Sequence, residues 1–137
     1  LSTTEPLFLD GVRTEHKKNI LQQVHEVFVA ECEVHKVSVV YDIFTLESMA
    51  EDIEQGAAVL VLVSTYRLDG KKAPHWVVVT GIDEDCLFVH DPDLDENEQA
   101  ALDCQHIPLA KVDFDKMSVL GLQRLRAAVV LRPKRSA

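Results

Sequence analysis

The stretch "KKAPHWVVVTGIDEDCLFVHDPD", residues 71–93, decides the fold that we expect for this chain. An apolar segment begins at His75, a short acidic segment follows, and a second apolar segment ends just before Asp91. Apolar runs bounded by turn-forming residues are typical of two antiparallel strands joined by a hairpin. The stretch therefore predicts an antiparallel sheet with a histidine where one strand begins and an aspartate where the next one ends.

Strand alternation relates this histidine to the aspartate. His75 shares a strand face with Val77 and Val79, because successive side chains point to opposite faces. If a turn of odd length is centred on Asp83, His75 lies directly opposite Asp91, with Cβ atoms about 4.5 to 5.5 Å apart. A carboxylate at that distance accepts the Nδ1 proton of an imidazole and orients the ring. A turn of two or four residues would separate the two side chains, and the pattern then describes only a surface histidine and an Asp-Pro turn.

The segments on either side of the hairpin complete an α+β pattern. Residues 14–34 carry apolar side chains at helical spacing, and a second helix is expected between its N-cap Thr45 and Gly56. The segment 57–64 is apolar on both faces, which is typical of a strand buried inside a sheet. Further strands are expected at residues 37–41, 106–110 and 127–132, with a helical turn at 113–117. Helices followed by mostly antiparallel strands predict an α+β fold.

Length, charge and cysteine content limit the partners and the compartment. The 137 residues fit a single domain, and 47% apolar residues are ordinary for a globular protein. A net charge of −9 would repel a nucleic-acid backbone or an anionic membrane surface. The longest apolar run, residues 57–63, is far shorter than the roughly 20 residues of a spanning helix. Three cysteines without a CxxC pair favour a reducing compartment, so we expect a cytoplasmic protein that binds neither nucleic acid nor membrane.

Metal ligands by residue type occur in the second half of the chain. Cys86 and His90 share a strand face but lie about 13 Å apart, too far for one zinc ion, and Cys104 with His106 is a weak pair. The acidic segment 91–102 copies the first positions of a calcium-binding EF-hand loop but lacks its central glycine and its final glutamate. No metal and no cofactor are expected.

Several of these motifs resemble the C-terminal lobe of papain-like cysteine peptidases of the bacteriocin-processing type. They are the segment 56–63, the run His75 to Val79, Gly81, and the run from Val89 to Pro92. The longer stretches "LVSTYRLDGKKAPHWVVVTG" and "LRAAVVLRP" resemble stand-alone bacterial relatives of those peptidases, and the resemblance covers residues 7–132. It implies a papain-like (cysteine proteinase) fold, in which an antiparallel sheet packs with helices.

The resemblance also implies roles for individual residues. His75 would be the general base that deprotonates a cysteine and then protonates the leaving amine, while Asp91 orients it. The reaction would be hydrolysis of a peptide or isopeptide bond in a peptide or protein substrate. Tyr66, Arg67 and Trp76 are expected to line the substrate cleft.

The nucleophile of that family has no counterpart before residue 14. In the family a cysteine begins the first helix of the domain and an oxyanion-stabilising glutamine precedes it, which favours the thiolate. Cys32 lies near the end of the first expected helix, where the dipole disfavours a thiolate. Cys86 is about 16 Å from Asp91 along one strand. Cys104 lies in a loop of unknown course, so the question whether it could be the nucleophile stays open.

We therefore expect residues 1–137 to be one peptidase-like domain, forming the C-terminal part of a larger papain-like domain whose cysteine precedes Leu1. The chain alone is expected not to hydrolyse peptides. The alternative is a non-catalytic peptidase-like domain that binds a peptide or protein partner without cutting it. The sequence does not predict the oligomeric state.

Overall fold

The computed structural model describes residues 9, 12–64, 66, 74–94, 98–121 and 124–134. These residues belong to two compact units, residues 1–43 with 120–125 and residues 44–119 with 126–137, and each unit is described by itself. None of the helices in this part of the chain has the length and hydropathy that a membrane crossing requires. The expectation of a single domain over residues 1–137 stays a prediction.

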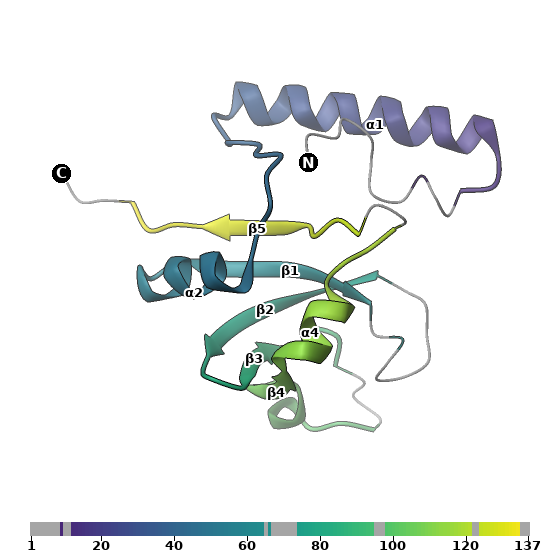
Figure 1. Ribbon diagram of the computed structural model, residues 1–137. Helices are drawn as coiled ribbons and strands as arrows, with labels where there is room; N and C mark the ends of the chain where they lie inside the picture. The colour runs from purple at the N-terminus through teal and green to yellow at the C-terminus, as the bar shows by residue number, and fades with distance from the viewer. Residues whose placement is uncertain are drawn as a thin grey trace. The chain divides into compact units, whose positions relative to one another are not determined.

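The first unit contains the long helix α1, Glu15–Val34, which confirms the helix expected at residues 14–34 (Figure 1). Thr14 caps its first turn, because the threonine hydroxyl accepts the main-chain N–H of Lys17 at 3.4 Å. None of the residues of α1 is buried. The strand expected at residues 37–41 is wrong, since this segment forms neither helix nor strand. Its β-branched residues fit a strand only where a neighbouring strand pairs with them.

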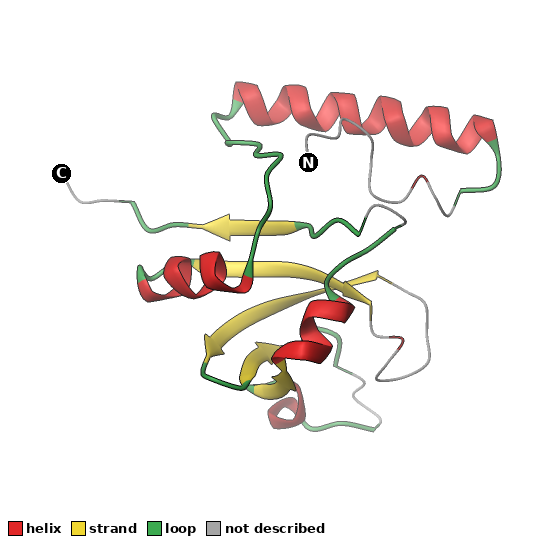
Figure 2. Ribbon diagram, in the orientation of Figure 1, coloured by secondary structure: helices red, strands yellow, loops and turns green. Residues whose placement is uncertain are grey.

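The second unit is built on a five-stranded sheet that is antiparallel throughout (Figure 2). In chain order the strands are β1 Ala58–Ser64, β2 Pro74–Ile82, β3 Cys86–His90, β4 Ile107–Ala110 and β5 Ala128–Leu131. Their order in the sheet is β4-β3-β2-β1-β5, so β2 is the middle strand and β1 is an inner one. The strands expected at 57–64, 106–110 and 127–132 are confirmed. The α+β class with an antiparallel sheet is confirmed as well.

Two helices cover one face of this sheet, α2 Leu46–Glu54 and α4 Lys111–Met117. Thr45 caps α2 through the N–H of Ser48 at 3.1 Å, and Gly56 follows with φ +81°, the left-handed conformation that glycine adopts without strain. The core lies between these helices and the sheet. Its buried members are Met49, Val59, Val61, Val63, Val77, Val79, Leu87, Val89, Leu109, Phe114 and Met117.

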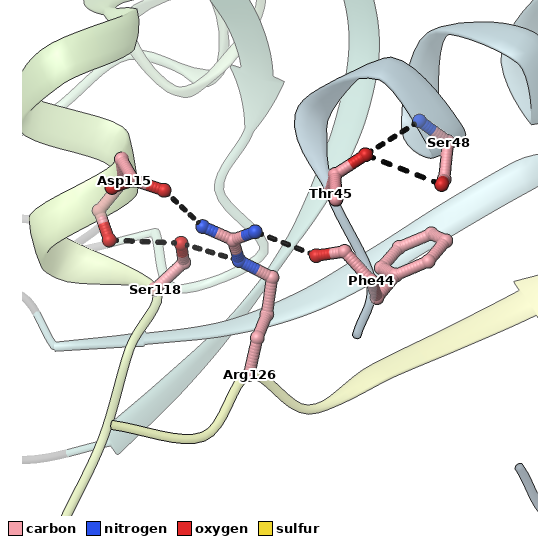
Figure 3. Close-up of polar contacts among 6 residues, drawn as sticks. All are labelled: Phe44, Thr45, Ser48, Asp115, Ser118 and Arg126. Carbon is pink, nitrogen blue, oxygen red and sulfur yellow. Dashed lines mark hydrogen bonds and ion pairs between the residues drawn. The ribbon is translucent and has the colours of Figure 1, made fainter. Parts of the chain in front are cut away.

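The guanidinium of Arg126 ties three segments of this unit together (Figure 3). It donates to the main-chain carbonyl of Phe44 at 2.6 Å, to the hydroxyl of Ser118 at 2.9 Å and to the carboxylate of Asp115 at 2.5 Å. Ser118 is fully buried and the Arg126 side chain is only 9% exposed. The start of α2, the end of α4 and the approach to β5 are thus held by one side chain.

Candidate active site

The hairpin of β2 and β3 has a different register from the expected one. Ile82 pairs with Leu87, so the turn is even, which is the alternative for which the sequence analysis expected His75 and Asp91 to separate. The register then shifts by one residue at Thr80, a β-bulge, so that Val79 pairs with Val89. The extra residue compensates for the even turn. His75 therefore keeps the predicted face, which it shares with the buried valines of β2.

His75 and Asp91 meet in the structure, although they are not directly opposite each other. Val78 pairs with His90, and continuing this register places Asp91 opposite Val77, two residues from His75. Diagonal neighbours in a sheet are within reach of long side chains. Nε2 of His75 lies 2.5 Å from Oδ1 of Asp91, and the two side chains are 20% and 25% exposed.

The nitrogen that contacts the carboxylate is Nε2, whereas the sequence predicted Nδ1. A hydrogen bond at one ring nitrogen fixes which tautomer the imidazole adopts. With the Nε2 proton held by Asp91, Nδ1 of His75 is the nitrogen that can exchange a proton with a reacting group. The contact thus orients an imidazole in the manner that general-base chemistry requires.

Asp91 itself is held by groups that the sequence analysis did not single out. Its Oδ1 also accepts the main-chain N–H of Asp93 at 2.8 Å, and its own N–H donates to the carbonyl of Cys104 at 2.9 Å. Cys104 ends the short 3-10 helix η2, Ala101–Cys104. An aspartate followed by proline is a recognised turn signal, so this local bond could have been predicted from the Asp-Pro-Asp sequence.

Two of the cysteines, Cys86 and Cys104, belong to the same unit as His75, and neither makes a described contact with it. Cys86 begins β3 and pairs with Ala110 of β4, so it lies at the opposite end of the strand from Asp91. Cys32 lies in α1 of the first unit. Cys104 lies beside Asp91, because its carbonyl binds the Asp91 N–H and it lines, with Asp91, a cavity of about 290 Å³ whose lining does not include His75.

The surroundings of Cys104 disfavour the thiolate form of its side chain. Burial raises its pKa, and the carboxylates of Asp91, Asp103 and Asp93 raise the pKa further. Its Sγ donates to Oε1 of Gln99 at 3.7 Å. Since the thiolate is the attacking species, Cys104 is poorly suited to be the nucleophile.

The residues expected to line a cleft are only partly described. Trp76 is 40% exposed and follows His75 in β2 on the opposite face. Tyr66 is 51% exposed, and Arg67 lies outside the described residues. A substrate-binding role for Tyr66, Arg67 and Trp76 stays a prediction.

Two histidines form a separate cluster beside β3. The rings of His90 and His106 meet edge to face with centroids 4.4 Å apart. The Thr80 hydroxyl donates to the carbonyl of Phe88 at 3.1 Å and lies 3.3 Å from Nδ1 of His106, so that nitrogen is the donor to Thr80. Across the described residues, no three His, Cys, Asp or Glu side chains are arranged to hold a metal ion.

Comparison with known families bears on this geometry. The family model DUF3335, described as Peptidase_C39 like family, matches residues 1–132 of the chain. This chain belongs to that family. Neither a curated protein nor a solved structure matches it. The chain is therefore a peptidase-like domain related to the C39-like peptidases, and its antiparallel sheet packed with helices is consistent with a papain-like fold.

Proposed function

We propose that this domain supplies the general base and its orienting carboxylate to a cysteine peptidase. The contact of His75 Nε2 with Asp91 Oδ1 at 2.5 Å is the observation that carries the proposal. An imidazole oriented in this way, largely shielded from water and within a peptidase-like family, matches the base half of a Cys-His-Asp triad.

In the proposed reaction, Nδ1 of His75 takes the proton of a cysteine thiol as the sulfur attacks the scissile carbonyl. The C–N bond then breaks, and the same nitrogen returns the proton to the leaving amine. Water hydrolyses the resulting acyl-thioester and regenerates the thiol. Asp91 keeps its charge throughout and stabilises the imidazolium.

The nucleophile in this proposal is a cysteine other than Cys32, Cys86 and Cys104, carried by a segment that precedes Leu1. The raised pKa of the Cys104 thiol supports this assignment, as does the place of Cys86 beside Ala110, at the opposite end of β3 from Asp91. Substrates of the bacteriocin-processing type, in which a leader peptide is removed, are the first class to test.

The test compares the chain of 137 residues with a protein extended by the residues encoded upstream. We expect the extended protein to cleave leader-bearing peptides and to react with a thiol-directed inhibitor, and the shorter chain to do neither. His75→Ala in the extended protein should lower kcat/KM by about 10²–10⁴-fold, the usual contribution of a general base. Hydrolysis by the shorter chain that depends on His75 would refute the proposed external nucleophile.

His35→Ala is the matched control variant. His35 also lies beside a carboxylate, with Nε2 3.4 Å from Oε2 of Glu31, but this pair is on the surface of α1. Its removal should leave kcat/KM unchanged. An equal loss in both variants would mean that the effect is not specific to the His75 site.

The second candidate is a non-catalytic domain that binds a peptide or protein partner. It is favoured by one observation, that neither Cys86 nor Cys104, the two cysteines in the same unit as His75, has a described contact with His75. Fluorescence anisotropy with the same peptides separates the two functions. Binding without cleavage by the extended protein would support the binding domain and overturn the peptidase.

A further inference from the structure

Asp91 lies one residue beyond the end of β3, where the strand ladder no longer holds the chain. Its carboxylate is one-quarter exposed, and a free side chain there would change rotamer and bind water. Two main-chain hydrogen bonds act in place of the ladder. The N–H of Asp91 is bound by the carbonyl of Cys104, and its Oδ1 is bound by the N–H of Asp93.

We propose that the main-chain N–H of Asp93 is a positioning group for the candidate site, because it holds Oδ1 of Asp91 against Nε2 of His75. The two donors lie 2.8 Å and 2.5 Å from the same oxygen, so the rotamer that binds one also presents the oxygen to the other. Pro92 lies between Asp91 and Asp93, and its restricted φ angle favours this closed turn. The catalytic meaning of this inference rests on the proposed function, whereas the geometry does not.

The role belongs to the main chain of Asp93 and not to its carboxylate. The Asp93 side chain is exposed and makes no hydrogen bond among the described residues. This separates the proposal from a purely electrostatic effect of the acidic segment. It also defines a pair of substitutions at one position, one that deletes the N–H group and one that deletes only the charge.

The experiment measures solvent exchange of the His75 Nε2 proton by NMR in the chain as it stands. Asp93→Pro removes the N–H group, and we expect the proton to exchange at least about tenfold faster, as for loss of a hydrogen bond to a charged group. Asp93→Ala keeps the N–H group and should change the exchange rate by less than about twofold. Asp91→Ala removes the acceptor and gives the reference exchange rate of the His75 Nε2 proton without its hydrogen bond.

A second variant guards against a folding defect in Asp93→Pro. Pro92→Gly keeps the N–H donor but loosens the turn, and it should raise the exchange rate about two- to fivefold through added chain entropy. The amide spectrum of the sheet reports folding. Unchanged exchange in a folded Asp93→Pro variant overturns the proposal, and if that variant unfolds, unchanged exchange in Pro92→Gly overturns it.

The exchange measurement does not depend on catalysis. If the extended protein proves inactive while Asp93→Pro still speeds exchange of the His75 Nε2 proton, the positioning role stands and the peptidase proposal fails. If the protein is active and Asp93→Pro affects neither exchange nor kcat, the positioning role fails and the peptidase proposal stands.

Discussion

The Cys104 thiol is almost fully buried at the end of η2, with three carboxylates nearby that raise its pKa. We expect iodoacetamide to label Cys104 slowly in the folded chain at neutral pH and rapidly after unfolding in urea. A variant that keeps Cys104 as its sole cysteine, Cys32→Ala with Cys86→Ala, makes the measurement specific. Equal labelling rates in the folded and unfolded states would contradict the buried, protonated thiol.

The same thiol makes stability depend on alkaline pH. Its folded pKa is raised above the ordinary value of 9.0, so the unfolded chain loses this proton first. The contribution of Cys104 to the free energy of unfolding is therefore full below about pH 9.0 and is lost as the pH rises toward the folded pKa. Urea unfolding between pH 8 and 10.5 should show this decline in the native chain, and Cys104→Ala should reduce it.

At the residue scale, the sequence predicted which side chains meet but not which atoms. Strand alternation and the family resemblance both selected His75 and Asp91, and the structure brings these two together. The choice of Nε2 over Nδ1 depends on the diagonal offset between the two strands. The even turn displaces the register by three residues from the expected one, and the bulge at Thr80 reverses one of these, which leaves the diagonal offset. Gly81, a glycine inside the strand next to the bulge, is a local signal that the sequence analysis did not use.

At the scale of secondary-structure elements, the Arg126 contacts are expected to stabilise the second unit. Arg126→Met keeps the apolar stem but leaves the Phe44 carbonyl and the buried Ser118 hydroxyl without their donor. We expect the free energy of unfolding to fall by about 2–4 kcal/mol. Lys134→Met, at an exposed position, should change it by less than about 0.5 kcal/mol. Urea titration followed by circular dichroism measures both, and a loss under about 1 kcal/mol in Arg126→Met would contradict the assignment.

The attachment of α4 to the sheet gives a second prediction at this scale. Phe114 is fully buried in the core, while Val112 on the same helix is 64% exposed. Phe114→Ala should cost about 3–5 kcal/mol through lost burial and the cavity that remains. Val112→Ala should stay within about 0.5 kcal/mol. Similar losses in both variants, measured by urea unfolding, would mean that α4 is not anchored through Phe114.

The elements that the sequence predicted correctly carry their own local signals. Both long helices begin at a threonine whose hydroxyl caps the first turn, and α2 is followed by a glycine with positive φ. The segment 37–41 has strand-forming residues but no partner strand, and partner strands cannot be read from local composition. The register of β2 and β3 was not predicted for the same reason, because the even turn and the bulge compensate for each other only in the folded sheet.

At the scale of the whole molecule, the two units are expected to differ in local stability. Helix α1 has no buried residue, whereas β1 and β2 contribute five of the valines in the buried core, Val59, Val61, Val63, Val77 and Val79. Segments with little buried apolar surface open at lower free energy. Hydrogen exchange followed by mass spectrometry should therefore show faster amide exchange in residues 15–34 than in residues 58–64 and 74–82. Equal protection of the two units would contradict this expectation.

The bulge at Thr80 makes Trp76 a fluorescent probe of how the sheet is assembled. If Thr80 were instead paired in the regular ladder that the even turn begins, every residue before it would change face, so that Trp76 would turn toward the core and His75 away from it. Trp76 is the only tryptophan of the chain and is 40% exposed in the bulged register. Its emission should therefore be red-shifted when the histidine is correctly placed and blue-shifted in a misaligned sheet. Deleting Thr80 removes the extra residue while leaving every pair in place, so this variant should retain the red-shifted emission.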